Sequence, residues 1–404
     1  MTGATLKRDL RTGRSVWADS PGLGVPVRPL DRAISVDVCI VGAGISAAFM
    51  ARELSRDHSV AVLDRRPPLM GSTVASTAML QWEIDLPLTA LADKIGQARA
   101  AQAYRRSRSA VEDLKQIVAN ERIVCGLKDK GSLYIAGDEY GHRALEAEAE
   151  ARAALGLESR YVGPAALREA YGMERTGAIV SEGSASADPA RLAAGLLRRA
   201  IADGARVYSP VEALDVIGDP DGVTLTTSSG HAVRAKKVIF CCGYEFPKGV
   251  PTPGAKVIST WALASKPRAR CPKWLRDMLV WEASDPYLYF RMGGDGRLIV
   301  GGEDEADPVA HEDKAKLKRK CETISAKLRR LLPEVEFEVD YSWAGAFGES
   351  STGLPSIGPI EGMDQCWAVM GFGGNGITYS VIASQIVATE VRGGSDPDAG
   401  LYRA

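Results

Sequence analysis

Two glycines and one acid near the start of the chain have a spacing that suits the binding of a phosphate and a sugar. Gly42 and Gly44 follow the apolar run 35–41, and Asp64 ends a second apolar run twenty residues after Gly44. Without a Cβ, the glycines allow a sharp turn and a close approach to a pyrophosphate, whose charge the N-terminus of the next helix would hold. Ala47 takes the third, helix-packing position, and Asp64 could accept hydrogen bonds from ribose hydroxyls. The pattern favours an adenine-dinucleotide site over a glycine turn in an ordinary strand–helix unit.

Four more glycines open a predicted helix near the C-terminus, within the segment 371–380. Their backbone leaves room for a flat ring, and the positive end of the helix would face that ring. A flavin gains negative charge around its N1 and C2 carbonyl when it is reduced, so such a helix end favours hydride acceptance. This segment alone could also be a turn without a ligand, but its pairing with the N-terminal motif favours a flavin dinucleotide.

Two tyrosines and an arginine alternate along a predicted strand. Tyr287, Tyr289 and Arg291 share one face by the two-residue period of a strand, so a phenol and a guanidinium could together hold a carboxylate. Trp261, on a neighbouring predicted strand, completes the set of candidate catalytic residues. The alternative is that Arg291 is a surface arginine on an edge strand and that the tyrosines pack inside the sheet.

Patterns of apolar residues place these motifs on helices and strands. Asp188 can cap a helix whose first position is Pro189, which returns the chain to the domain of the first motif. Helical spacing covers 88–120, 143–155, 189–203, 312–332 and 376–391, and strand patterns cover 35–41, 60–64, 131–136, 205–208, 237–243, 287–291 and 297–302. The basic side chains of 312–332 could bind phosphate, although charges on a helix usually form a solvated face.

The composition is that of a large folded enzyme without strong net charge. The 404 residues are 45% hydrophobic, which is enough for a large core and two domains. Lys and Arg number 50 and Asp and Glu 51, which argues against nucleic acid or a membrane surface as a partner. No apolar run approaches the ~18 residues of a membrane span, so we expect neither a span nor a targeting segment.

The seven cysteines and four histidines point away from disulfides and metals. The cysteines are scattered, odd in number and without a CxxC pair, which indicates reduced thiols and a cytoplasmic protein. The histidines are far apart in the sequence, so no metal site is expected.

In the order and spacing of its motifs, the chain resembles the D-amino-acid oxidase superfamily of FAD-dependent oxidoreductases, which includes glycine oxidase, sarcosine oxidase and γ-glutamylputrescine oxidase. The resemblance rests on 41–47, 71–77, 188–192, 238–243, 296–303, 341–345, 354–358 and 371–380. It implies an α/β fold in which a Rossmann-like FAD-binding domain of the glutathione-reductase-2 type is interleaved with an α+β substrate domain built on an antiparallel sheet. The expected FAD-binding domain comprises 35–88, 177–245 and 340–404, the substrate domain 89–176 and 246–339, and an N-terminal arm 1–34.

The resemblance also implies that FAD is bound without a covalent bond. Some relatives attach the flavin to a histidine after a Gly-Ser-Thr motif, where this chain has Val74 and Ala75, and sarcosine oxidases use a cysteine that is absent here near Gly345. The residues expected to hold FAD are Gly42, Gly44, Ile45, Ser46, Asp64, Arg65, Ser72, Thr73, Ser76, Thr77, Val211, Cys242, Gly243, Gly345, Gly373, Gly374, Asn375, Gly376 and Ile377.

The chemistry implied by the resemblance is oxidation of a C–N bond in an amine or amino acid. The α C–H of a neutral amine delivers hydride to flavin N5, and the imine is hydrolysed, so no protein nucleophile or obligate base is required. D-amino-acid and glycine oxidases use an arginine shortly before the motif at Leu354, where this chain has Trp343, Phe347 and Glu349, so the usual recognition of an α-amino carboxylate is in doubt. The strand 298–300 lacks the oxygen-activating lysine of sarcosine oxidases. The electron acceptor is therefore O2 or another carrier.

Three alternatives remain open at this point. A 2-hydroxy-acid dehydrogenase shares the scaffold, although the scarcity of histidine argues against alcohol oxidation. The chain could instead be an FAD-binding subunit of a larger oxidoreductase. Arg65 and Arg66 would suit an NADP-type nucleotide, but the C-terminal glycine helix has no role in that case. The substrate's side chain and stereochemistry and the oligomeric state are not specified by the sequence, which allows an oligomer.

Overall fold

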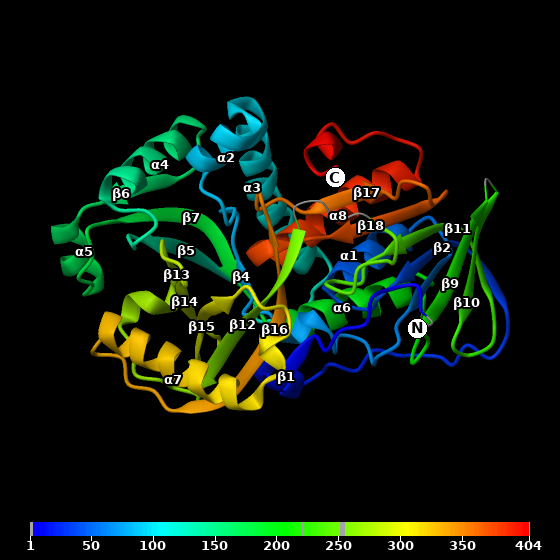
Figure 1. Ribbon diagram of the computed structural model, residues 1–404, viewed down its shortest axis with the longest axis horizontal. Coiled ribbons are helices and arrows are strands. Elements are labelled where there is room, and N and C mark those ends of the chain that lie inside the picture. Colours follow the sequence, from blue (N-terminus) through cyan, green and yellow to red (C-terminus); the bar gives the residue numbers. More distant parts are fainter. Residues whose placement is uncertain (1–2, 220, 251–254, 404) are drawn as a thin grey trace.

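Two β-sheets organise the chain, and the chain passes back and forth between them (Figure 1). The computed structural model describes residues 3–219, 221–250 and 255–403. Within these residues one sheet has eight strands and the other has ten. The eight-stranded sheet lies on the right of Figure 1 and the ten-stranded sheet on the left. The arrangement agrees with the expected α/β fold of two interleaved domains.

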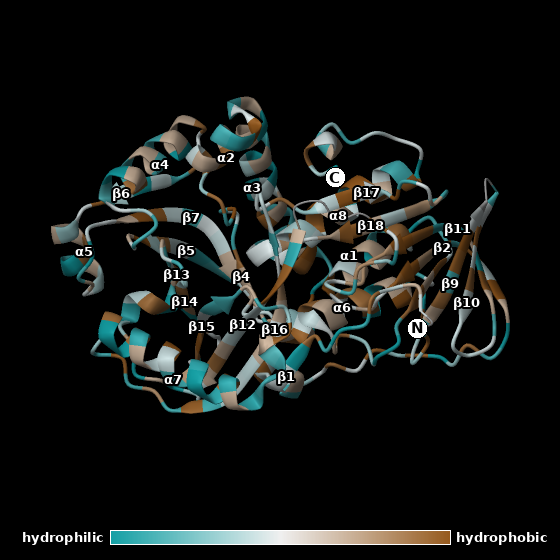
Figure 2. Cartoon of the chain, viewed as in Figure 1, coloured by the Kyte–Doolittle hydropathy of each residue, from teal (hydrophilic) through white to brown (hydrophobic). Residues whose placement is uncertain are grey.

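The eight-stranded sheet contains the first glycine motif. Its strands are β2 (Ile34–Val41), β3 (Val60–Leu63), β8 (Arg206–Tyr208), β9 (Ala213–Asp219), β10 (Gly222–Thr227), β11 (Val233–Phe240), β17 (Ser356–Pro359) and β18 (Cys366–Met370). The order is β17-β18-β11-β2-β3-β8, and the run from β18 to β8 is parallel. Figure 2 shows that strands of this sheet are largely apolar. This is expected of parallel strands that are covered on both faces.

The helices begin and end close to the residues that the sequence predicts, with two exceptions: the helix at 164–171 was not predicted, and the helix predicted at 88–120 is divided. They are α1 (Ile45–Leu54), α2 (Leu88–Ile95), α3 (Gln97–Asn120), α4 (His142–Ala154), α5 (Pro164–Tyr171), α6 (Pro189–Ala202), α7 (Lys314–Leu331) and α8 (Gly376–Val391). The predicted helix 88–120 is divided into α2 and α3, because Gly96 adopts a φ of +87° that ends the first helix. Asp188 caps α6 as predicted, since its carboxylate accepts hydrogen bonds from Ala190 N and Arg191 N at 3.0 Å.

The ten-stranded sheet is mostly antiparallel. Its strands are β1 (Arg11–Arg14), β4 (Met79–Leu80), β5 (Lys128–Ile135), β6 (Ser159–Val162), β7 (Ala178–Ser186), β12 (Ala255–Ser265), β13 (Met278–Glu282), β14 (Leu288–Met292), β15 (Leu298–Glu305) and β16 (Val339–Ser350). Helix α7 packs on one face through Leu317, Ile324 and Leu328. The other face meets the first domain through Ala262, Trp343 and their neighbours.

The domain boundaries expected from the sequence differ from the division into two sheets. Strands β7 and β16 belong to the ten-stranded sheet, although 177–245 and 340–404 were expected in the FAD-binding domain. Helix α3 packs against α8 and shares the core of the first domain, although 89–176 was expected in the substrate domain. Strand β1 lies within the expected N-terminal arm and pairs with β16. Strands that cross between domains carry no local signal of which sheet they join, because pairing depends on distant partners.

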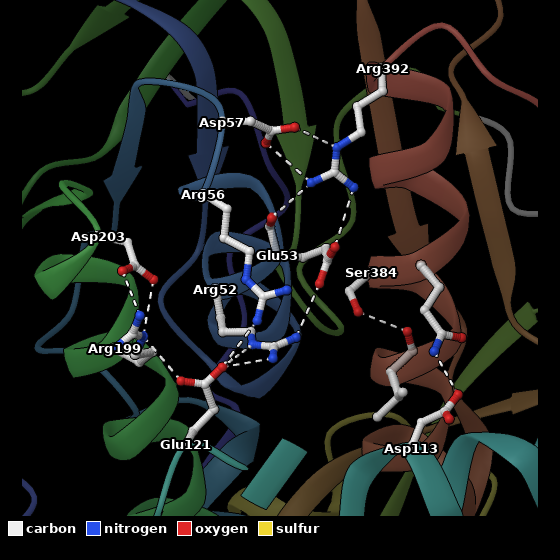
Figure 3. A network of polar contacts seen from close by, with 12 residues as sticks. Arg52, Glu53, Arg56, Asp57, Asp113, Glu121, Arg199, Asp203, Ser384 and Arg392 are labelled. Atoms are coloured by element: carbon white, nitrogen blue, oxygen red, sulfur yellow. Dashed lines mark hydrogen bonds and ion pairs between the residues drawn. The ribbon is translucent and has the colours of Figure 1, made fainter. Parts of the chain in front are cut away.

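A network of ion pairs joins helices α1, α6 and α8 to one another and to the residue that follows α3 (Figure 3). Glu121, which follows α3, accepts hydrogen bonds from Arg52 of α1 at 2.7 Å and pairs with Arg199 of α6 at 3.0 Å. Arg392, after α8, pairs with Asp57 at 2.7 Å and lowers the pKa of that carboxyl to about 2. The network fixes the ends of α1, α6 and α8 relative to one another, so it supports the two helix N-termini that face the site described below.

Among the described residues, no helix has the length and apolar character needed to cross a membrane.

Candidate active site

A cavity of about 640 Å³ extends from the carboxyl ends of β2 and β3 to one face of the ten-stranded sheet. Its volume lies in the range of about 300–1,000 Å³ that is usual for ligand sites. Every residue that the sequence analysis expects to hold FAD lines this cavity. The two glycine motifs, which are more than 300 residues apart in the sequence, therefore face one space.

The first motif requires glycine for a reason that the structure makes specific. Gly42 has a φ of +110°, and a Cβ at this position would lie 2.3 Å from the carbonyl oxygen of Cys241. Gly44 is the N-cap of α1 and provides no side-chain cap, while Ile45 N donates to Thr73 Oγ1 at 2.9 Å. The N-terminus of α1 therefore opens into the cavity, where its dipole favours an anion such as a pyrophosphate.

Asp64 is held by the backbone of the same turn. Its two carboxylate oxygens accept hydrogen bonds from Ala43 N at 2.7 Å and from Arg66 N at 2.8 Å. Burial raises the pKa of Asp64, and the two backbone donors oppose that effect. Arg65 and Arg66 both pair with Glu245, Arg66 at 2.6 Å. Because these guanidinium groups are already engaged, the arrangement argues against an NADP-type 2′-phosphate site.

The second motif meets a carboxylate that the sequence analysis missed. Gly374 N donates to Asp85 Oδ2 at 2.7 Å, and a Cβ at either Gly373 or Gly374 would lie 2.5 Å from an oxygen of the same carboxylate. Asn375, the N-cap of α8, donates its side-chain amide to Glu83 O and does not cap the helix. The N-terminus of α8 thus opens into the cavity beside Asp85. The sequence offers one weak indication of this contact, which is that Asp85 is an acidic residue in the segment after β4.

Arg291 does not face the cavity, which corrects the expectation that it binds a substrate carboxylate. Its side chain is buried, and it donates to Thr77 O at 2.8 Å and to Ala187 O at 2.9 Å. The guanidinium lies 5.4 Å from the centre of the Trp17 ring. Arg291 shares a strand face with Tyr289, as predicted, but the segment that ends at Thr77 covers it. Its position indicates that it supports the cavity wall from behind.

Trp261 also lies away from the cavity, because it projects from the opposite face of β12. Its ring packs in the core under α7, with Lys320 Nζ 4.7 Å from its centre. The preceding residue, Thr260, lines the cavity and pairs in register with Gly345 of β16. The residue of β12 expected to face the cavity was therefore wrong by one position. The cause is that β12 carries apolar residues on both faces, so its sequence does not alternate clearly between apolar and polar residues.

Tyr287 and Tyr289 line the cavity, and their catalytic role stays a prediction. Their rings are 5.3 Å apart and inclined by 31°. Tyr289 pairs across the strands with Gly301, where a Cβ would lie 2.3 Å from the tyrosine hydroxyl oxygen. Glycine at 301 therefore allows the phenol to lie over the neighbouring strand, and burial raises the pKa of both tyrosines.

Further aromatic and acidic residues surround these tyrosines. Tyr134 and Trp281 stack with their rings 5.0 Å apart, and both line the cavity, as does Tyr244. Burial raises the pKa of Asp304 to about 6, against the effect of nearby hydroxyl groups. Burial likewise raises the pKa of Asp85 to about 6, the Gly374 amide opposes the shift, and negative charge on Glu349 adds to it. These residues come from separate segments, so no local motif could have identified them.

The described residues contain no group of three or more His, Cys, Asp or Glu that could hold a metal ion. The described wall of the cavity contains no histidine or lysine, and its cysteines are Cys241 and Cys242. Burial raises the pKa of both thiols, which makes them unreactive.

Comparisons with known proteins agree with this geometry. The model of the DAO family, described as FAD dependent oxidoreductase, matches residues 37–390. YhfW of Bacillus subtilis (strain 168), named as a Rieske 2Fe-2S iron–sulfur protein, is 24% identical over 372 residues, which cover 91% of this chain and 70% of that protein. Gamma-glutamylputrescine oxidoreductase of Escherichia coli (strain K12) is 23% identical over 394 residues, 95% of this chain and 89% of that protein. The crystal structure of glycine oxidase from Geobacillus kaustophilus superposes with a TM-score of 0.75 at 22% identity, over 90% of this chain and 96% of that one.

Proposed function

The chain belongs to the DAO family of FAD-dependent oxidoreductases, and from this membership we propose that it oxidises the C–N bond of an amine or amino acid. The observation that carries the proposal is the cavity that joins both glycine motifs to a chamber of tyrosines and acids. The relatives named for glycine and for γ-glutamylputrescine, both of which contain C–N bonds, support the choice of reaction.

FAD is the cofactor of the family, and the residues present fit it. Gly42 and the open N-terminus of α1 would hold the pyrophosphate, Asp64 the ribose, and the segment 72–77 with the N-terminus of α8 the flavin ring. Bound there, FAD would supply the hydride acceptor. Non-covalent binding is supported by the absence of histidine from the described wall and by the buried state of its two cysteines.

The chain's own groups would position the substrate and exclude water. Tyr287 and Tyr289 form an aromatic wall, and Tyr244 closes the chamber from the first domain. A neutral amine can give up hydride without a protein base, so the lack of a histidine in the described wall is compatible with amine oxidation. Oxidation of a 2-hydroxy acid would require a group to accept the hydroxyl proton and a cation to hold the carboxylate, and the described chamber offers neither a histidine nor an unengaged arginine. The free cysteines also fit a cytoplasmic location.

Anaerobic reduction of the flavin tests the proposal. The FAD-loaded protein would be mixed with a panel of amines, amino acids and 2-hydroxy acids while flavin absorbance is followed. Loss of absorbance with amines or amino acids is expected, and loss with 2-hydroxy acids alone would overturn the proposal. If none of these compounds lowers the flavin absorbance, the result would favour an FAD-binding subunit of a larger complex. Reoxidation of the reduced protein by O2, or by an iron–sulfur protein of the kind that YhfW is named for, would then identify the electron acceptor.

A further inference from the structure

One part of the cavity is lined by three carboxylates, which come from the segment after β4, from β15 and from β16. We call it the acidic chamber and define it by Asp85, Tyr244, Tyr287, Tyr289, Asp304 and Glu349, all of which line the cavity. The charges of Asp85 and Asp304 both act on Tyr287 and on Tyr244, so the two carboxylates face the same space from opposite domains. The three tyrosines line the same cavity, and the rings of Tyr287 and Tyr289 are in contact.

No cation balances this chamber among the described residues. Arg65 and Arg66 are the only basic residues that line the described part of the cavity, and they pair with Glu245 at the nucleotide end. Lys320, which is close enough to act on Asp304, donates to Glu303 O at 2.8 Å and pairs with Glu305 at 2.9 Å. It therefore lies on the α7 side of the sheet, above the Trp261 ring.

The two chamber aspartates differ in how far their hydrogen-bonding capacity is used. Asp85 accepts a hydrogen bond from Gly374 N, so it is partly satisfied by the turn before α8. Burial raises the pKa of the Asp304 carboxyl and the neighbouring hydroxyl groups of Thr260 and Tyr287 lower it, whereas its buried Oδ1 atom has no hydrogen-bond partner of good geometry among the described residues. A buried carboxylate oxygen without a partner is costly unless a ligand supplies a donor or a charge.

From this arrangement we propose that the substrate is a diamine or polyamine without a carboxylate, whose distal ammonium group binds Asp304 among the tyrosine rings. The proposal rests on the proposed function and adds the substrate class. An ammonium group supplies three donors to a carboxylate and is attracted by aromatic faces. A carboxylate on the substrate would instead meet Asp85, Asp304 and Glu349 in a site of low polarity, where like charges repel strongly.

A matched set of four-carbon compounds tests the substrate class. The FAD-loaded protein is reduced anaerobically with 1,4-diaminobutane, 1-aminobutane and 4-aminobutanoate, which differ only in the group at the far end. We expect half-saturation for the diamine at a concentration about tenfold or more below that for the monoamine, because a hydrogen bond to a charged group contributes that much. We expect no reduction by the amino acid. Equal or faster reduction by 4-aminobutanoate would overturn the substrate class and leave the proposed function intact, whereas failure of every amine and amino acid would overturn both.

An unreactive ligand tests Asp304 directly. Binding of 1,4-bis(trimethylammonio)butane to the oxidised protein can be followed by the change in flavin absorbance, without turnover. This ligand has no N–H donor and would be held by its charge and by the aromatic faces, so Asp304→Asn is expected to weaken its binding by about 10-fold to 100-fold, and Asp304→Glu to restore most of it. Asp277→Asn is the control, since Asp277 is exposed and does not line the cavity. Unchanged affinity in Asp304→Asn would overturn the role of Asp304. Flavin content and the midpoint of thermal unfolding show whether each variant is folded. If Asp304→Asn does not fold, the Asp304→Glu variant and the comparison of the three four-carbon compounds decide the outcome.

Discussion

Replacing Arg291 with methionine separates the two roles considered for this side chain. If Arg291 supports the cavity wall, the variant loses its hydrogen bonds to Thr77 O and Ala187 O, at 2.8 and 2.9 Å, and leaves both carbonyls buried. A hydrogen bond from a charged donor contributes about 1.5–3 kcal/mol. Removal of a buried charge, whose burial lowers the pKa of Arg291 to about 10, offsets part of this loss. We expect the free energy of unfolding to fall by about 2–4 kcal/mol.

Arg291→Met should change the retention of FAD and leave the affinity for the substrate nearly unchanged. Thr77 ends the segment that lines the proposed flavin position, so the variant should release FAD faster, as measured by the rise of free-flavin fluorescence after dilution. Once the variant is saturated with FAD, the half-saturating concentration of an amine should change by less than about twofold. Arg270→Met is the control, because the Arg270 side chain is exposed and its ion pair with Glu336 lies at the surface. Normal stability and FAD retention together with a large rise in half-saturation would refute the reasoning and return Arg291 to the substrate site.

Three further perturbations test other parts of the site. Gly42→Ala should abolish most FAD binding, measured as flavin absorbance per protein, because its Cβ would lie 2.3 Å from Cys241 O; full flavin content would contradict the assignment of this turn. Glu245→Gln should speed FAD release, since it weakens the pairing that orders two arginines near Asp64; an unchanged release rate would count against that role. Affinity for the bis-quaternary ligand should fall as the pH decreases through about 6, because Asp85 and Asp304 are charged above that value and gain protons below it; a flat profile across pH 6 would exclude them as the binding charges.

The residues of the proposed cofactor site could be selected from the sequence because their signals are local. A glycine with positive φ at 42, an acid at 64 and a glycine-rich start to α8 each act through backbone within a few residues, and the structure brings all of them to one cavity. The end of α2 at Gly96 is also a local effect, but helical spacing on both sides of that glycine concealed the break.

The substrate side was less predictable because it depends on pairing between distant strands. Trp261 and Thr260 are equally plausible from the sequence, and only the register of β12 against β16 decides which of them faces the cavity. Arg291 has the correct parity, but the contact with Ala187 O that engages it comes from another part of the chain. Asp85 and Asp304 are more than 200 residues apart in the sequence, so their approach could not be inferred without the fold.

The most decisive measurement is a single turnover of the FAD-loaded protein with 1,4-diaminobutane in the absence of oxygen. Hydride transfer from the carbon beside nitrogen predicts that one aminoaldehyde and one ammonia are formed for each flavin reduced, since water hydrolyses the imine. Flavin that remains oxidised with the diamine and with every other amine and amino acid, or flavin that is reduced without release of ammonia or an amine, would contradict C–N bond oxidation by this chain.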